Sequence, residues 1–285
     1  MKPASFEYHA PKTVAEAVAV LAEVAPDDGH VLAGGQSLVP TMAFRLATPA
    51  HLVDINGIEE LATLSVDGDA ISIGAGVRHA AFHSPVTDGG LGALLSQVVH
   101  HIAHYPIRQR GTFCGSLAQA DPSSEWCLTA VTLDAVLTAE SVRGSREIAA
   151  ADFIDGIMTT ALAEDELLTQ VRLPIPAGDT CFGFAEFNRR AGDFAIAMAM
   201  VAYRLEDGVI IEPRIGIGGA EDHPRRIEEA EAALQGRSPD ADAFAAAADA
   251  AAAVVDPMED NNSSADYRRD LVATLTRRAL EGAQS

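Results

Sequence analysis

The stretch VLAGGQSLVP, residues 31–40, places Gly34 and Gly35 directly behind a short apolar run that reads as a buried strand. A glycine pair at the end of a strand marks a bend that something must approach closely, because no side chain stands in the way. Taken alone, the pair is also typical of an ordinary turn. The dinucleotide-binding pattern G-x-G-x-x-G is disfavoured because QSLV, residues 36–39, supplies no third glycine, although Asp54 lies at the separation expected of a ribose-binding acid.

A second segment of the same character, RGTFCGSLAQADPSSE, follows at residues 110–125. It combines small residues with the hydroxyl groups of Thr112 and Ser116. Exposed backbone N–H groups and short hydroxyls suit a pyrophosphate, which needs several donors and no bulky neighbours. We call residues 31–38 the first glycine segment and residues 110–125 the second glycine segment. Together they predict a single diphosphate held between two bends, as in a dinucleotide cofactor that spans two small α/β subdomains.

The local patterns around these segments predict alternating helices and strands. Thr13 and Glu16 have the spacing of a capping box in front of an apolar stripe, which predicts a helix over residues 13–24. Alternating apolar residues predict strands at residues 51–55 and 69–77. The further predicted elements in this half are helices over residues 91–104 and 126–137.

A change in composition near LPIPAGDT, residues 173–180, predicts a linker between two domains, since two prolines and a glycine interrupt the pattern there. Beyond it, residues 195–219 read as two or three strands with a turn at residues 206–208. The alanine-rich residues 242–255 and the final residues 263–280 have helical propensity, and a serine is available to cap the last helix.

The composition restricts the class of partner. Lysine and arginine number 20 against 41 acidic residues, a formal net charge of −21 over 285 residues, so a nucleic acid or an anionic membrane surface would be repelled. We expect no membrane insertion and a cytoplasmic location, because no apolar run approaches the roughly 18 residues of a membrane helix and the start lacks a signal-peptide core. Three widely spaced cysteines suit free thiols and cannot build a four-cysteine iron–sulfur cluster.

Five motifs in order make a more specific pattern over nearly the whole chain. They are AGGQSLVP, RGTFCGSLAQADPSSE, RRAGDFAIA, GGAEDHPRRIEEAEAAL and SSADYRRDLVATLTRRAL. In this order the chain resembles the FAD-binding medium subunit of molybdenum hydroxylases, the xanthine dehydrogenase and carbon monoxide dehydrogenase flavoprotein family. The resemblance implies an α+β fold: a PCMH-type FAD-binding domain of two α/β subdomains over residues 1–176. A C-terminal domain with a small antiparallel sheet packed on helices follows over residues 177–285.

The resemblance also implies which residues bind FAD. The first glycine segment and the turn from Thr112 to Ser116 would wrap the diphosphate, Glu125 would accept hydrogen bonds from sugar hydroxyls, and Leu168 and Ile102 would contact the flavin. The predicted FAD-binding residues are Val31, Leu32, Ala33, Gly34, Gly35, Gln36, Ser37, Leu38, Ile102, Gly111, Thr112, Cys114, Gly115, Ser116, Ala118, Asp121, Glu125 and Leu168.

The chain departs from the family pattern at two places. Cys114 stands where relatives usually carry the first glycine of T-x-G-G, and a positive φ there would cost cysteine about 1 kcal/mol. Relatives often place a cofactor-contacting lysine near the linker. FAEFNRR has Ala185, Glu186 and Asn188 instead, so no lysine role is carried over.

No metal site and no catalytic triad are predicted. His100 and His104 are four residues apart, as are His79 and His83, a spacing that two metal-binding imidazoles can use on one helix. Such pairs are more often ordinary helix residues. No nucleophile, base and orienting acid occur at a recognisable spacing, so we assign no catalytic residue and expect a bound flavin to carry the chemistry.

The predicted function is that of an FAD-carrying electron-transfer subunit. The resemblance implies a small partner subunit with [2Fe–2S] clusters that delivers electrons, and a large molybdopterin subunit that hydroxylates the substrate, assembled as a dimer of heterotrimers. The alternatives are a stand-alone flavin-dependent reductase or oxidase of the same fold, and a non-enzymatic nucleotide-binding module. A flavin absorption spectrum separates the last from the others.

Overall fold

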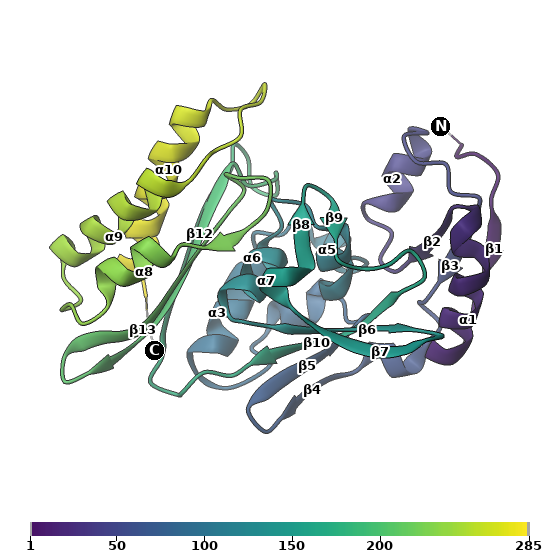
Figure 1. Ribbon diagram of the computed structural model, residues 1–285, viewed down its shortest axis with the longest axis horizontal. Helices are drawn as coiled ribbons and strands as arrows, with labels where there is room; N and C mark the ends of the chain where they lie inside the picture. Colours follow the sequence, from purple (N-terminus) through teal and green to yellow (C-terminus); the bar gives the residue numbers. More distant parts are fainter. Residues whose placement is uncertain (1, 284–285) are drawn as a thin grey trace.

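The computed structural model describes residues 2–283, so Met1 and residues 284–285, which fall within the predicted domain ranges, lie outside it. Residues 2–283 form a three-stranded parallel sheet, a five-stranded antiparallel sheet, a two-stranded hairpin and a four-stranded antiparallel sheet. The hairpin is inserted in the chain just before the last strand of the five-stranded sheet. In Figure 1 the three-stranded sheet lies at one end of the molecule and the C-terminal helices at the other. The predicted α+β fold class is confirmed.

The N-terminal sheet has the strand order β1-β3-β2, all parallel, and carries α1 on one face. The predicted helix is confirmed: it begins at Val14, and the Thr13 side chain accepts a hydrogen bond from the Glu16 N–H as the capping box requires. The elements of this N-terminal part are β1 (Glu7–His9), α1 (Val14–Val24), η1 (Ala25–Asp27), β2 (Gly29–Leu32), α2 (Leu38–Ala43), β3 (His51–Asp54) and η2 (Glu59–Ala62). The first glycine segment therefore runs from the end of β2 into the start of α2.

The middle of the molecule is built on the five-stranded sheet, ordered β4-β5-β10-β6-β7. Its strands are β4 (Leu64–Asp67), β5 (Ala70–Gly74), β6 (Val136–Ser141), β7 (Gly144–Ala149) and β10 (Leu167–Pro174), and the hairpin is β8 (Ile154–Gly156) with β9 (Thr159–Thr160). Its helices are η3 (His79–His83), α3 (Gly89–Val99), α4 (Tyr105–Arg108), α5 (Phe113–Gln119), α6 (Glu125–Thr132) and α7 (Ala150–Phe153).

The C-terminal part packs its sheet against helices α8, α9 and α10 (Figure 1). The two or three strands predicted over residues 195–219 are two, β12 and β13, with the expected turn between them, and the alanine-rich helix and the final helix are confirmed. Ser264 caps the final helix by accepting from the Tyr267 N–H at 3.3 Å. The elements are β11 (Cys181–Phe187), β12 (Ala197–Glu206), β13 (Val209–Gly218), β14 (Arg225–Arg226), α8 (Glu228–Leu234), α9 (Ala241–Val254) and α10 (Ala265–Glu281).

Helix α6 lies at the centre and fixes the position of the site. All of its residues are buried, as expected of a helix that packs on every side. On one side a glycine of β13 makes the close approach possible, because a Cβ at Gly216 would lie 1.9 Å from Thr132 Oγ1. Thr132 is the last residue of α6, so this approach holds the C-terminal end of the helix against the C-terminal sheet. Just before the other end of α6, Ser123 Oγ donates to the Ala195 carbonyl at 2.9 Å, so the chain around Glu125 is also tied to the C-terminal part.

Two predicted helices were too long. The helix expected over residues 91–104 ends at Val99, and Ala103 then takes a left-handed conformation with φ 44° before α4 begins. The helix expected over residues 126–137 ends at Thr132, and residues 136–141 form β6, whose side chains alternate between half-buried and buried. Tertiary pairing of this alternating run with β10 outweighs its helical propensity. Among residues 2–283, no helix combines the length and the apolar composition that crossing a bilayer requires.

Candidate functional site

A cavity of about 440 Å³ opens where the three parts of the chain meet, a volume typical of small-molecule and cofactor sites. It is lined by the first glycine segment, by residues 111–125 of the second, by the loop after α3, and by residues 192–194 between β11 and β12. Every predicted FAD-binding residue except Cys114 and Leu168 contributes to this lining. Two glycine-rich stretches nearly eighty residues apart in sequence therefore share one cavity.

The two glycine segments touch each other through their backbones. A Cβ at Gly34 would lie 2.4 Å from the Arg110 carbonyl oxygen and 2.6 Å from Gly111 Cα. A Cβ at Gly111 would in turn lie 2.5 Å from His79 Nε2. Gly35 has φ +69°, a left-handed conformation that favours glycine. Gly34 and Gly111 are therefore needed because the two segments pack directly against each other. This contact places both segments in one wall of the cavity.

The first glycine segment presents unpaired backbone donors. Within residues 2–283, the N–H groups of residues 34–37 donate no hydrogen bond to another protein group. Successive unpaired N–H groups at a bend form a concave anion site, and a diphosphate fits such a donor set. The second glycine segment is a helix start rather than the predicted turn: Thr112 caps α5, and its Oγ1 accepts from the Gly115 N–H at 3.0 Å.

The charged groups that line the cavity indicate where the parts of a dinucleotide would bind. Among the described residues that line it there is no lysine or arginine, while Asp121, Glu125 and Asp193 contribute carboxyl groups. An anionic diphosphate is favoured at the backbone donors of residues 34–37 and disfavoured beside carboxylates. Sugar hydroxyls, which donate hydrogen bonds, suit these carboxyl groups.

Burial changes the protonation of these acids. Desolvation, with smaller contributions from Glu186 and Asp121, raises the pKa of Glu125 to about 8. Burial also raises the pKa of Asp121, although the Ser123 N–H donates to its Oδ1 at 2.9 Å and opposes the shift. Glu125 is therefore largely protonated at neutral pH, and its carboxyl group can both donate and accept a hydrogen bond with a hydroxyl group.

Two residues that sequence reasoning missed tie the glycine segments together. Asn56 Nδ2 donates to the Ala33 carbonyl at 2.8 Å, and Arg78 donates both to Asn56 Oδ1 and to the Arg110 carbonyl. This bridge joins the Ala33 carbonyl of the first glycine segment to the Arg110 carbonyl of the second, and neither Asn56 nor Arg78 lines the cavity. Asn56 follows β3, the strand beside β2, and a polar residue at the end of a neighbouring strand was the available signal.

His79, weighed from the sequence only as half of a histidine pair, also lines the cavity. It is buried, and the Trp126 indole N–H donates to its Nδ1 at 3.0 Å. Burial, with the positive charges of Arg108 and Arg78, lowers the pKa of His79 to about 4. The ring is therefore neutral, and because Nδ1 accepts, the proton lies on Nε2, the nitrogen beside Gly111. No sequence pattern distinguishes such a histidine from a surface one.

Two predicted FAD-binding residues do not line the cavity. Cys114 lies inside α5 without a positive φ, its side chain is buried, and its thiol donates weakly to the Ile73 carbonyl at 3.5 Å. The expected strain at this position is therefore absent. Leu168 is buried within β10, where it pairs with Ala139. Both side chains contribute to the hydrophobic core.

The histidine pairs considered for metal binding are also separated by the fold. His100 follows α3 and His104 precedes α4, so they do not lie on one helix turn. His83 Nε2 accepts from Arg108 Nε at 2.9 Å, and His79 is engaged by Trp126. None of these four residues belongs to the metal-ligand cluster found among the described residues.

Two protein-family models together match almost the whole chain. Residues 4–176 match the FAD binding domain in molybdopterin dehydrogenase, and residues 182–283 match the CO dehydrogenase flavoprotein C-terminal domain. The nicotine 6-hydroxylase medium subunit of Paenarthrobacter nicotinovorans is 37% identical, with 98% of each chain covered. The carbon monoxide dehydrogenase medium chain of Hydrogenophaga pseudoflava is 35% identical over 99% of this chain and 98% of that one.

Solved structures agree with these matches. A carbon monoxide dehydrogenase structure from Hydrogenophaga pseudoflava superposes with a TM-score of 0.94 at 37% identity, covering 99% of this chain and 98% of the other. Quinoline 2-oxidoreductase from Pseudomonas putida 86 gives a TM-score of 0.93 at 36% identity, covering 99% and 97%. The chain therefore belongs to the family of FAD-binding medium subunits of molybdenum hydroxylases, and its cofactor is FAD.

Proposed function

We propose that the cavity between the two glycine segments holds FAD so that this chain carries electrons from a partner's iron–sulfur clusters to an external acceptor. The observation that supports this most directly is the backbone contact of Gly34 with Arg110 and Gly111, which makes one binding wall from two distant segments. Bound FAD supplies a carrier that accepts electrons singly or in pairs. The protein's contribution is to bind the cofactor, exclude water from it and hold it in place.

Each group of lining residues has a proposed role. The N–H groups of residues 34–37, with the first turn of α5, hold the diphosphate. Glu125 and Asp121 hydrogen-bond to the ribityl or ribose hydroxyls. Ile102, which is buried at the cavity wall, packs against the flavin ring. The neutral His79 keeps positive charge out of the wall formed by the second glycine segment while its Nε2–H remains a donor there.

We further propose that the chain works within a complex. Relatives that match over almost their whole length are called medium subunits or medium chains, and another is a subunit of a 6-hydroxypseudooxynicotine dehydrogenase complex. The proposed partners are a small [2Fe–2S] subunit and a large molybdopterin subunit, arranged as a dimer of heterotrimers. The three cysteines are free thiols, which supports a reducing compartment, the cytoplasm.

Two measurements test this function. The purified chain should be yellow and contain FAD at a ratio close to one per chain. Native purification from the source should yield the chain together with a molybdopterin protein and an iron–sulfur protein, with molybdenum and iron in the same peak. A FAD-containing chain that reduces an acceptor at full rate as an isolated monomer would instead indicate a stand-alone reductase or oxidase. A colourless chain that does not take up FAD would reject both.

A further inference from the structure

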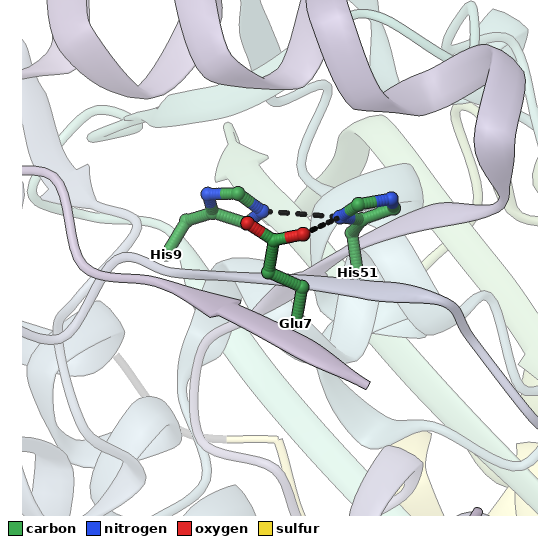
Figure 2. A group of neighbouring side chains, drawn as sticks. All are labelled: Glu7, His9 and His51. Carbon is green, nitrogen blue, oxygen red and sulfur yellow. Dashed lines mark hydrogen bonds and ion pairs between the residues drawn. The ribbon is translucent and has the colours of Figure 1, made fainter. Parts of the chain in front are cut away.

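Away from the FAD cavity, three metal-ligating side chains meet on the three-stranded sheet. Glu7 and His9 are two residues apart on β1 and so project from the same face of the strand. His51, on β3, is the direct register partner of Glu7 in the parallel ladder. Figure 2 shows the three side chains on one face of the two strands, with their polar atoms turned toward one another. Backbone pairing alone therefore brings the three donors together.

The distances between the donor atoms suit a common metal ion. His9 Nε2 and His51 Nδ1 are 3.1 Å apart, His51 Nδ1 and Glu7 Oε2 are 3.7 Å apart, and all three donors lie within 4.8 Å of one another. Two imidazole nitrogens that each bind Zn²⁺ at about 2.0–2.1 Å are separated by roughly 3.0–3.4 Å at the angles such sites use. The nitrogen pair needs no movement to reach this separation.

The donor types limit which ion fits. Two imidazoles and one carboxylate favour late first-row divalent transition ions, whereas Mg²⁺ and Ca²⁺ prefer oxygen ligands. His9 and His51 are half-buried while the Glu7 side chain is 68% exposed, so one side of the cluster faces solvent. Three protein donors with an open side leave room for water in the remaining coordination positions.

The location indicates a structural effect rather than a part in electron transfer. Glu7 and His51 lie at the start of their strands, whereas the first glycine segment begins where β2 ends, opposite Asp54. Tyr8, between the two β1 ligands, donates to Asp54 Oδ2, and Asp54 Oδ1 accepts from Asn56, the residue that holds the Ala33 carbonyl. Edge strand β1 is thus connected to the first glycine segment through this chain of hydrogen bonds.

We propose that Glu7, His9 and His51 bind a divalent late first-row transition ion of the Zn²⁺ type, which fastens edge strand β1 to β3. This site is separate from the FAD site and does not depend on the proposed function. The ion joins two strands that are otherwise paired over only three residues of β1, so its binding should raise the thermal stability of the N-terminal subdomain.

The test uses the full FAD-containing chain, stripped with EDTA and titrated with Zn²⁺ by calorimetry, with Co²⁺ as a spectroscopic probe. His51→Ala and Glu7→Gln should each weaken binding roughly tenfold or more, because one of three donors is lost. His223→Ala is the matched control: that histidine also lies beside a carboxylate, Asp222 at 2.7 Å, but has no second imidazole. It should leave the titration unchanged.

Two readouts decide the outcome. At a Zn²⁺ concentration that just saturates the parent, the melting temperature should rise clearly more in the parent and in His223→Ala than in His51→Ala or Glu7→Gln. At the same Co²⁺ concentration, the ligand-field bands should be clearly weaker in His51→Ala and Glu7→Gln than in the other two chains. Glu7 is exposed, so Glu7→Gln keeps the test informative even if His51→Ala folds poorly. Equal Zn²⁺ affinity in the parent and Glu7→Gln chains would overturn the three-donor site, and no saturable binding to the parent would show that the histidines only hydrogen-bond to each other.

Discussion

Substituting Gly34 by alanine tests whether the contact between the glycine segments creates the FAD site. The new Cβ would lie 2.4 Å from the Arg110 carbonyl oxygen, about 1 Å short of the 3.4 Å at which ordinary contact begins. Its neighbours are backbone atoms, so no side chain can rotate out of the way. The two segments must separate, and overpacking of this kind costs about 1–3 kcal/mol.

The expected result is a weaker complex with FAD. Binding requires the separated segments to close again, so a cost of about 1–3 kcal/mol corresponds to a rise in Kd of roughly 5- to 150-fold. The assay is a titration of FAD-free chain followed by flavin fluorescence, alongside the melting temperature. Gly178→Ala is the control, because a Cβ there meets no heavy atom within 4 Å. An unchanged Kd for Gly34→Ala would refute the shared wall.

Three further changes test other parts of the site. Asn56→Ala leaves the Ala33 carbonyl and Arg78 without their shared partner, so FAD affinity measured by the same titration should fall about 5- to 100-fold, and an unchanged Kd would show that the bridge has no role. Glu125→Gln tests the raised pKa of Glu125. In the FAD-free chain, the protonated Glu125 carboxyl contributes its full stabilisation below pH 4.5, its ordinary pKa, and this stabilisation is lost as the pH rises through about 8. Urea unfolding at a series of pH values should therefore show stability falling over this window by on the order of a few kcal/mol, with a clearly flatter profile in the variant. Cys114→Gly should lower the free energy of unfolding by about 1–2 kcal/mol, because it leaves a cavity and places a glycine in a helix, while FAD affinity stays within about twofold. Tighter FAD binding by this variant would instead show that cysteine strains the backbone at this position.

Local sequence patterns were enough for much of the fold. The helix capped by Thr13, the hairpin turning at residues 206–208 and the helix capped by Ser264 follow from signals within a few residues, because capping and strand alternation are short-range effects. Signals of the same range failed at residues 91–104 and 126–137. There the helix ended early, because a left-handed residue or pairing with a distant strand outweighed helix propensity.

Most residues predicted from the sequence to bind FAD line one cavity, but how they come together was not readable from the sequence. The glycines mark where a backbone must be approached, yet that Gly34 rests on Arg110 and Gly111 depends on contacts between distant segments. The same holds for Asn56, because Ala33 and Arg78, the two partners that it joins, lie more than twenty residues away on either side.

The sequence by itself determined that this protein has strand-and-glycine bends, free cysteines, a strong negative charge and the ordered motifs of a flavoprotein family. Only the tertiary structure decided that the bends share one wall, that Glu125 is largely protonated and His79 neutral, and that Glu7 and His51 stand side by side. The physical reason is that burial and strand register, which set protonation and donor distances, arise from long-range packing and have no signature in neighbouring residues.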